Sequence, residues 1–416
     1  MSTMKVPERV LPSFFKNIEI VGNETLQSCR LSVDDELKKK KIDCEISARS
    51  TPMLMVTKKV KGIYLSNNFT QIKELEKKAQ ADLKPIYDNI SQHKENAWTR
   101  VRSGDEEFYM SWSSGGSMWV RTVSNAPFQN GTSYVAKVQV GTYSASGGVL
   151  GIQNYEFTTP YMIGSVIVSF ILACSLASIV ATGLGFVVSA FALAAANAAA
   201  ALGFESFSCT VAVASLTTVA ACLVFAVVFI GLVYLWSWLN RKYTIRLQIF
   251  NWDEDNDWSV CGSYHDNAII AGSGETYVPQ FSLPKKIKPG TPVTPPGFQP
   301  VEVLDSVCYY ATVIWENDNT FMEGCSMALK IRKGNTDQGF MWAFDCPRFS
   351  DNQQAAADGS MDPKAYFKQV KWSKTPLNFS IKATSTQIPV AFGLDALSGA
   401  SDNLYNVNIH IGNKKE

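Results

Sequence analysis

The chain has 416 residues, of which 46% are hydrophobic and 18% charged, and its formal net charge is +1. This length allows two or three domains, and the balanced charge provides no basic face, so nucleic acid is not expected as a partner. The averages conceal one segment of different composition. No Asp, Glu, Lys or Arg occurs from Phe157 to Phe204 or from Ser206 to Asn240, and Glu205 alone separates the two runs.

The N-terminal part predicts a mixture of helices and strands. Its first fifteen residues lack the apolar core of a signal peptide, so we expect a protein made in soluble form in the cytoplasm, or released, without such a peptide. In residues 34–41 acids precede bases, which favours a short exposed helix; a basic lipid-contacting patch is the alternative. Residues 71–100 predict a helix that is bent or broken near Pro85.

Short alternating patterns at 108–120 and 134–140 then indicate strands. Trp112 and Trp119 flank a stretch rich in Ser and Gly. Two exposed rings around a flexible loop would suit contact with lipid headgroups or sugars. The alternative is a hairpin with both rings packed in the core.

The second half of the charge-free segment is the stronger candidate for crossing a membrane. Between Val211 and Leu235, fourteen residues are Leu, Ile, Val or Phe, which favours insertion by about 4 to 8 kcal/mol. The stretch exceeds the ~20 residues that a helix needs to span a bilayer. The aromatic and basic residues that suit a membrane interface follow at its end: Tyr234, Trp236, Trp238, Arg241 and Lys242. A buried central helix of a soluble protein is the alternative.

The first half is longer and less lipophilic. Residues 162–181 could span a bilayer alone, whereas residues 186–202 are dominated by Ala and carry Asn197 at their centre. Because Ala gains little from lipid, this stretch inserts marginally unless it packs on another helix. Gly183 and Gly185 lie between the two stretches, where a helix could turn or kink.

Two topologies fit this segment. In the first, it is a helical hairpin that turns near Glu205, with arms of about 60 and 50 Å and with Tyr161 and Trp236 at the same interface. In the second, three shorter spans turn near Gly183 and Glu205. We favour the hairpin because both flanks carry strand patterns and can belong to one β-body.

Strand patterns return after the apolar segment. The alternation at 243–249 predicts a half-buried strand in an antiparallel sheet, followed by a polar turn at 251–258. Alternation recurs at 327–331 and 405–411, and Asp362-Pro363 favours the start of a short helix. Residues 241–283 either belong to the C-terminal sandwich or pair with the N-terminal strands.

The predicted fold class is therefore α+β, with a β-sandwich-rich body and an inserted long hydrophobic α-helical hairpin. The predicted segments are an N-terminal α+β domain (1–157), the hydrophobic membrane-inserting hairpin (158–240), strands continuing the β-body (241–283), a proline-rich linker (284–300) and a C-terminal β-sandwich (301–416).

Catalytic patterns are weak. His93, His265 and His410 are far apart, and although His265 precedes Asp266, no Gly-x-Ser-x-Gly elbow accompanies it. The acids Asp253, Asp255 and Asp257 have the spacing of a calcium loop, but the Gly and Glu that complete such a loop are missing. Two alternatives remain for this segment, a looser calcium site and an ordinary acidic turn. We expect no enzyme activity, no metal and no cofactor.

A hydrophobic hairpin between two soluble parts resembles the α-helical pore-forming toxins and the pore domains of colicins. The resemblance implies a protein that is soluble until it binds a target cell membrane, then oligomerises with its own copies and inserts residues 161–240. A lipid or glycan receptor is a further expected partner. The sequences from Tyr243 to Trp258 and from Trp342 to Pro347 resemble aegerolysins, small β-sandwiches that bind membrane lipids. The alternative is a resident membrane protein with β-rich adhesion or sensing domains.

Overall fold

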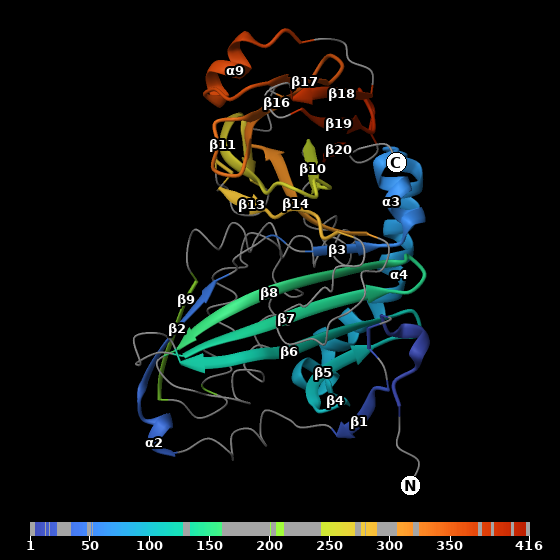
Figure 1. Cartoon of the computed structure of the whole chain (residues 1–416), viewed down its shortest axis with the longest axis vertical. Coiled ribbons are helices and arrows are strands. Elements are labelled where there is room, and N and C mark those ends of the chain that lie inside the picture. The colour runs from blue at the N-terminus through green and yellow to red at the C-terminus, as the bar shows by residue number, and fades with distance from the viewer. Residues whose placement is uncertain are drawn as a thin grey trace. The chain divides into compact units, whose positions relative to one another are not determined.

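The computed structural model in Figure 1 describes part of the chain. The described residues are 5–12, 14–15, 17–22, 35–47, 51, 53–127, 134–159, 200, 205–211, 243–270, 276–278, 280–288, 306–318, 324–372, 377–383, 387–400 and 403–412. They fall into two units, in which strands predominate. The first draws on residues 1–49, 74–234 and 290–303, and the second on 50–73, 235–289 and 304–416.

The sheet of the first unit is an antiparallel series of neighbouring strands. Its order is β1 (Glu19–Gly22), β4 (Thr99–Ser103), β5 (Glu106–Trp112), β6 (Gly116–Pro127), β7 (Tyr134–Ser144) and β8 (Val149–Thr159). Figure 1 shows β6, β7 and β8 as long strands side by side. β8 also pairs antiparallel with β2 (Lys41–Ser47). The strands predicted at 108–120 and 134–140 are thus present.

Helices of the first unit begin and end close to the predicted residues. The short helix α2 (Asp35–Lys38) has acids in its first turn and a lysine in its last. Helix α4 (Phe69–His93), which belongs to the first unit from residue 74 onwards, runs through Pro85 without a break. The short 3-10 helices η1 (Glu8–Val10) and η2 (Lys94–Ala97) also lie in this unit. Of the bend or break predicted near Pro85, the break is therefore absent. Pro85 removes one backbone hydrogen bond of the helix. The helix continues because its apolar face is buried on both sides of Pro85, where Leu83 and Ile86 are both buried.

The second unit is a sandwich of two sheets. One has the order β3 (Met53–Val56), β14 (Ser306–Asn317), β10 (Thr244–Asn251), β20 (Leu404–Ile411), β19 (Ile388–Leu394) and β18 (Asn378–Ala383), and β12 (Ala268–Ile270) also pairs with β14. The other has the order β13 (Phe281–Leu283), β11 (Trp258–Asp266), β15 (Cys325–Lys333), β16 (Gly339–Cys346) and β17 (Gln353–Asp358). Strands from 244–283 therefore pair with strands from 306–411.

Alternating apolar side chains from both sheets form the core of this sandwich. Leu247, Trp315, Trp342, Phe392 and Val407 are fully buried members of it. Two helices pack on the unit. In α3 (Lys58–Leu65), Tyr64 lies 5.3 Å from the ring of Phe250. In α9 (Pro363–Gln369), Asp362 caps the first turn as the sequence predicted, and Tyr366 packs on the outer side of β15 and β16.

The strand at 244–251 differs from its prediction in two ways. All eight residues of β10 are buried, including Arg246 and Gln248, so the strand is covered on both faces instead of one. It pairs antiparallel with β14 and parallel with β20, so the sheet is mixed. Alternation shows which face is apolar, but it does not show whether the polar face is exposed.

Only a short part of the predicted hairpin lies among the described residues. Ser206–Val211 form strand β9, which pairs parallel with β2. The expectation of a helix from residue 206 onwards is wrong for these six residues. Their alternation of polar and apolar side chains, followed by β-branched Thr210 and Val211, favours a strand.

The remaining interface and hairpin residues lie outside the described part of the chain. They are Tyr161, Gly183, Gly185, Asn197, Tyr234, Trp236, Trp238, Arg241 and Lys242. Within the described residues, no helix combines the length and the apolar character needed to cross a bilayer.

Candidate functional site

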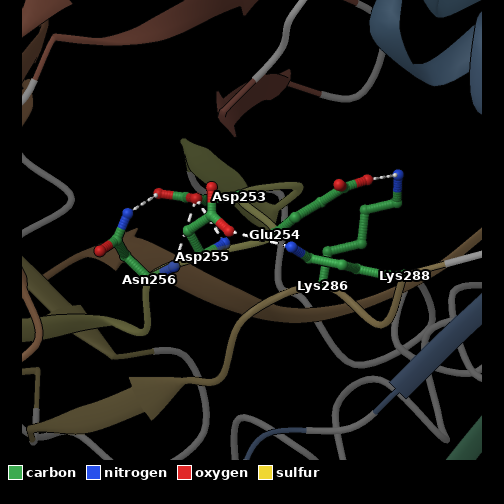
Figure 2. A network of polar contacts seen from close by, with 6 residues as sticks. All are labelled: Asp253, Glu254, Asp255, Asn256, Lys286 and Lys288. Atoms are coloured by element: carbon green, nitrogen blue, oxygen red, sulfur yellow. Dashed lines mark hydrogen bonds and ion pairs between the residues drawn. The ribbon is translucent and has the colours of Figure 1, made fainter. Parts of the chain in front are cut away.

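A network of polar contacts lies at the turn between β10 and β11 in the second unit (Figure 2). Asp253 is its centre and is only 7% exposed. One carboxylate oxygen, Oδ1, accepts the backbone N–H groups of Asp255 and Asn256 at 3.0 and 3.3 Å. The other, Oδ2, accepts the side chains of Asn256 and Trp258, both at 3.0 Å. Four donors within five residues thus stabilise one buried charge.

Asn251 joins this turn to the segment that follows β13. Its Oδ1 accepts the backbone N–H of Asp253 at 3.0 Å. Its Nδ2 donates to the carbonyl oxygens of Leu283 and Pro284, both at 2.8 Å. The chain after β13 is thereby fixed beside the acidic turn, and this placement brings its lysines within reach of the acids.

Two ion pairs connect the segments. Lys286 Nζ lies 3.0 Å from Glu254 Oε1, and Lys288 Nζ lies 3.1 Å from Asp255 Oδ1. The Lys286 side chain is 5% exposed, so Glu254 compensates a nearly buried ammonium group. The exposed pair raises the pKa of Lys288 through its hydrogen bond with Asp255, and such a pair adds little stability.

A cavity of about 490 Å³ opens beside this network within the second unit. Lysines from three separate segments line it, namely Lys61 of α3, Lys286 and Lys333 of β15. The Lys61 ammonium lies 5.7 Å from the centre of the Trp252 ring. The other lining residues are Leu65, Asp253, Glu254, Asp255, Asn256, Gln387, Ile388, Pro389 and Gly412. The lining combines both signs of charge with a small apolar wall, which suits a polar or charged group.

The calcium interpretation of the acidic turn is not supported. Asp253 accepts four N–H groups, Asp255 pairs with Lys288, and Asp257 Oδ1 accepts the backbone N–H of Lys285 at 2.8 Å. Among the residues that the structure describes, no three His, Cys, Asp or Glu side chains are grouped as metal ligands. The ordinary acidic turn is the alternative that fits.

The two histidines of the second unit contact core indoles. His265 Nε2 accepts from Trp315 Nε1 at 3.1 Å, and burial lowers the pKa of His265 to about 4. His410 Nδ1 accepts from Trp252 Nε1 at 3.1 Å, while its Nε2 lies 3.0 Å from Asn67 Oδ1. A proton on Nε2 satisfies both contacts of His410. Burial lowers its pKa to about 3, so both rings are neutral near pH 7.

The remaining predicted site residues that the structure describes lie in the first unit. Trp119 is fully buried, donates to Gln139 Oε1 at 3.2 Å and packs edge-on against Phe15. Its ring is therefore not presented to a headgroup or sugar, which favours the alternative of a core tryptophan. Trp112 is partly exposed. Glu205 is exposed, and its backbone N–H donates to the Lys38 carbonyl at 2.9 Å, next to β9.

The hydrogen-bond network around Asp82 was not predicted from the sequence. Asp82 of α4 accepts the Ser144 hydroxyl at 2.7 Å and the backbone N–H and hydroxyl of Ser146 at 2.9 and 2.6 Å. Its own carbonyl accepts the Ser113 hydroxyl at 2.6 Å. These contacts attach two turns of the sheet to the helix. Because the partners follow 31 to 64 residues later, no local pattern marks them.

Comparison with protein-family models and with curated protein sequences gave no match to this chain. Its function is therefore inferred from its own residues.

Proposed function

We propose that this protein binds a target membrane and inserts residues from 161–240 into it. One observation carries the proposal: apart from Glu205, this stretch holds no Asp, Glu, Lys or Arg, and it lies between two parts of a β-rich chain. Among the described residues, those between Ile245 and Ile411 form a buried core cluster in the second unit, drawn from both of its sheets.

The strand β9 divides the inserting segment into two arms, 161–199 and 212–240. The second arm still exceeds the ~20 residues of a membrane-spanning helix, and its terminal Tyr234, Trp236 and Trp238, with Arg241 and Lys242, suit the interface. The Ala-rich first arm, with Asn197, inserts beside a partner helix, either the second arm or another copy of the chain. Entry of both arms as a hairpin requires β9 to leave β2.

The cavity of the second unit is the candidate contact with the membrane surface. Lys61 and Lys333 line it from different segments, while Lys286 is paired with Glu254. Lysines in such a lining can bind an anionic group such as a lipid phosphate. We expect Lys333→Gln to weaken binding to phospholipid vesicles several-fold. Lys330→Gln, on the same strand but outside the cavity lining, is the matched control.

Dye release from liposomes tests insertion. We expect the purified chain to release dye, and Phe225→Arg to lower the rate at least tenfold, because a charge at the centre of a spanning helix costs about 2.5 to 3.5 kcal/mol. Phe225→Leu keeps the lipophilic character and retains release. If the intact chain releases no dye from any lipid mixture, the proposal fails.

A resident membrane protein is the competing function, and fractionation separates the two. A monomer that is purified without detergent supports insertion on demand. Protein found only in the carbonate-resistant membrane fraction supports permanent residence.

A further inference from the structure

Another cavity of the second unit, with a volume of about 590 Å³, contains a thiol beside a guanidinium group. Cys261 of β11 and Arg332 of β15 both line it. We propose that this cavity is a redox-modification site, in which the Cys261 thiol forms a mixed disulfide with a small polar disulfide of the glutathione type. The site stands apart from the membrane proposal and can be tested without it.

An extra residue in strand β11 places this thiol. Val260 pairs with Ile331 of β15. The next pair joins Gly262 to Lys330, so Cys261 has no register partner. A bulge of this kind redirects a side chain. Val260 is fully buried in the core, whereas Cys261 is partly exposed, so the thiol lies at the cavity and not in the core.

The sulfur of Cys261 has two polar contacts. Arg332 Nε donates to Cys261 Sγ at 2.9 Å. The thiol itself donates to the backbone carbonyl of Lys330 at 3.5 Å. The hydrogen bond to the sulfur raises the pKa of Arg332, so the guanidinium group stays charged. When the thiol loses its proton, the resulting anion therefore keeps a charged donor, and the thiolate is the nucleophilic form of cysteine.

Two carboxylates lie in the surroundings of this guanidinium group. Asp337 Oδ1 lies 3.2 Å from Arg332 Nη1, but the Asp337 side chain is 97% exposed, so water and salt screen its charge. Asp257 lines the cavity, and its Oδ1 accepts the backbone N–H of Lys285 at 2.8 Å. Arg332 is in direct contact with the sulfur, so its charge acts most strongly on the thiolate.

The other thiols that the structure describes as free have different surroundings. Cys308 and Cys325 are fully buried, and Cys346 is 1% exposed. Burial raises the pKa of Cys308, so this thiol stays protonated at neutral pH. Reactive cysteines are partly exposed and lie beside a positive charge. Among these four thiols, Cys261 alone meets both conditions.

The size and the lining of the cavity indicate the class of reagent. A volume of about 590 Å³ falls in the range of sites for small molecules. Gln280, Ser282 and Asn335 contribute amide and hydroxyl groups to the lining. Such groups donate to and accept from the amides and carboxylates of a short peptide. Glutathione disulfide has this chemistry and carries the sulfur–sulfur bond that the thiolate attacks.

The reaction is a single thiol–disulfide exchange. Cys261 releases its proton to water, and the thiolate attacks one sulfur atom of glutathione disulfide. A bond forms between Cys261 Sγ and that sulfur atom, and the sulfur–sulfur bond of the reagent breaks. The second glutathione leaves as a thiolate and takes up a proton from water. Cys261 is thereby oxidised to a mixed disulfide, and half of the reagent is reduced to glutathione.

Timed reaction of the full reduced chain with glutathione disulfide tests the site. After blocking of the remaining thiols and digestion, mass spectrometry measures the modified fraction of each cysteine. We expect Cys261 to acquire glutathione at least tenfold faster than Cys308, Cys325 or Cys346, and reductant to reverse it. Cys261→Ser leaves the rates of the other three unchanged. A rate at Cys261 no higher than at these buried thiols, or its linkage to another cysteine of the chain, overturns the site.

Replacement of the guanidinium group tests its part in the reaction. We expect Arg332→Gln to slow the modification of Cys261 about tenfold, because the thiolate loses a charged donor. Arg332→Lys keeps the charge and reacts at an intermediate rate. Lys330→Gln removes a positive charge from the same strand, where the backbone and not the side chain contacts the sulfur, and it reacts as the wild type does.

Two further measurements separate this effect from a change of fold. Tryptophan fluorescence confirms that each variant is folded before the reaction begins. In concentrated urea, where the contact between Arg332 and Cys261 is absent, all variants are expected to react at the same rate. Equal rates of Arg332→Gln and wild type in the folded state overturn the role of Arg332, and a difference that persists in urea overturns it as well.

Discussion

The two units each contain an aspartate that gathers several hydrogen-bond donors, and the comparison shows two ways of fixing a turn. Asp253 takes all four of its donors from the next five residues. Asp82 takes its donors from Ser144 and Ser146, more than sixty residues later. The first shapes a loop locally, while the second attaches helix α4 to distant turns of the sheet.

The two networks also differ in what remains if the carboxylate is removed. Around Asp253, the buried indole N–H of Trp258 and two backbone N–H groups lose their acceptor. Around Asp82, Ser146 is exposed and can turn to water, while Ser144 still accepts the backbone N–H of Gly147 at 3.0 Å. Because unsatisfied buried donors are costly, we expect loss of the carboxylate to lower the free energy of unfolding more in the second unit than in the first.

Replacement of Asp253 is expected to have the largest effect. Asp253→Ala lowers the free energy of unfolding of the second unit by about 3 to 4 kcal/mol, because several buried donors lose a charged acceptor. Urea unfolding followed by tryptophan fluorescence measures it. Asp257→Ala, at an exposed position of the same turn, is the control and costs about 1 kcal/mol or less. Equal losses in the two variants would contradict the role given to Asp253.

Protonation of a single buried histidine is expected to have the next largest effect, and it acts on the second unit. An unfolded histidine binds a proton near pH 6.5, whereas His265 and His410 bind one only near pH 4 and 3 in the folded chain. Stability present above about pH 6.5 is therefore lost as the pH falls toward 4, by about 3 kcal/mol for His265 alone. Urea unfolding at pH 7 and about 4.5 measures the loss.

Histidine variants assign that pH dependence. His265→Gln and His410→Gln each flatten the difference between the two pH values, although each also changes stability at pH 7. His93→Gln, on the exposed end of α4 in the first unit, leaves the difference unchanged. If the difference in stability between the two pH values persists in both His265→Gln and His410→Gln, the acid sensitivity belongs to carboxylates instead.

Replacement of Asp82 is expected to have the smallest effect of the three. Asp82→Ala destabilises the first unit by about 1 to 2 kcal/mol, because Ser144 loses one acceptor. Hydrogen exchange should accelerate at the 144–148 turn. Asp88→Ala, which removes a surface ion pair with Lys84 on the same helix, is the control and costs less than about 0.5 kcal/mol. Protection of the turn that persists in Asp82→Ala would show that the helix is attached by other contacts.

Local patterns were enough to predict several of the individual elements. The helix after Asp362 was predicted because an Asp-Pro pair both caps and starts a helix. The strands around Leu329 and Val407 were predicted because apolar residues alternate there. The strand at Ser206–Val211 was overlooked, because the absence of charge over the whole segment outweighed a short alternation within it.

Only the acidic turn of the candidate site was predicted from the sequence, and the lysines that contact it were not. The acidic turn stands out in the sequence, so Asp253 and Asp255 were noted. Lys286 and Lys288 were not assigned, because they reach the turn from 32 and 33 residues later. Their approach depends on the pairing of β13 with β11 and on the two hydrogen bonds from the Asn251 amide to Leu283 and Pro284, which no sequence pattern specifies.

The strand β20 has a consequence for how the chain is made. It lies between β10 and β19 in the sheet, and the ribosome synthesises it after every strand that it touches. The sandwich therefore stays open while β10 to β19 emerge, and the apolar segment leaves the ribosome long before that sandwich can close. A nascent chain stalled before Leu404 would show this as an unfolded, protease-sensitive second unit, with the charge-poor residues 161–240 already translated.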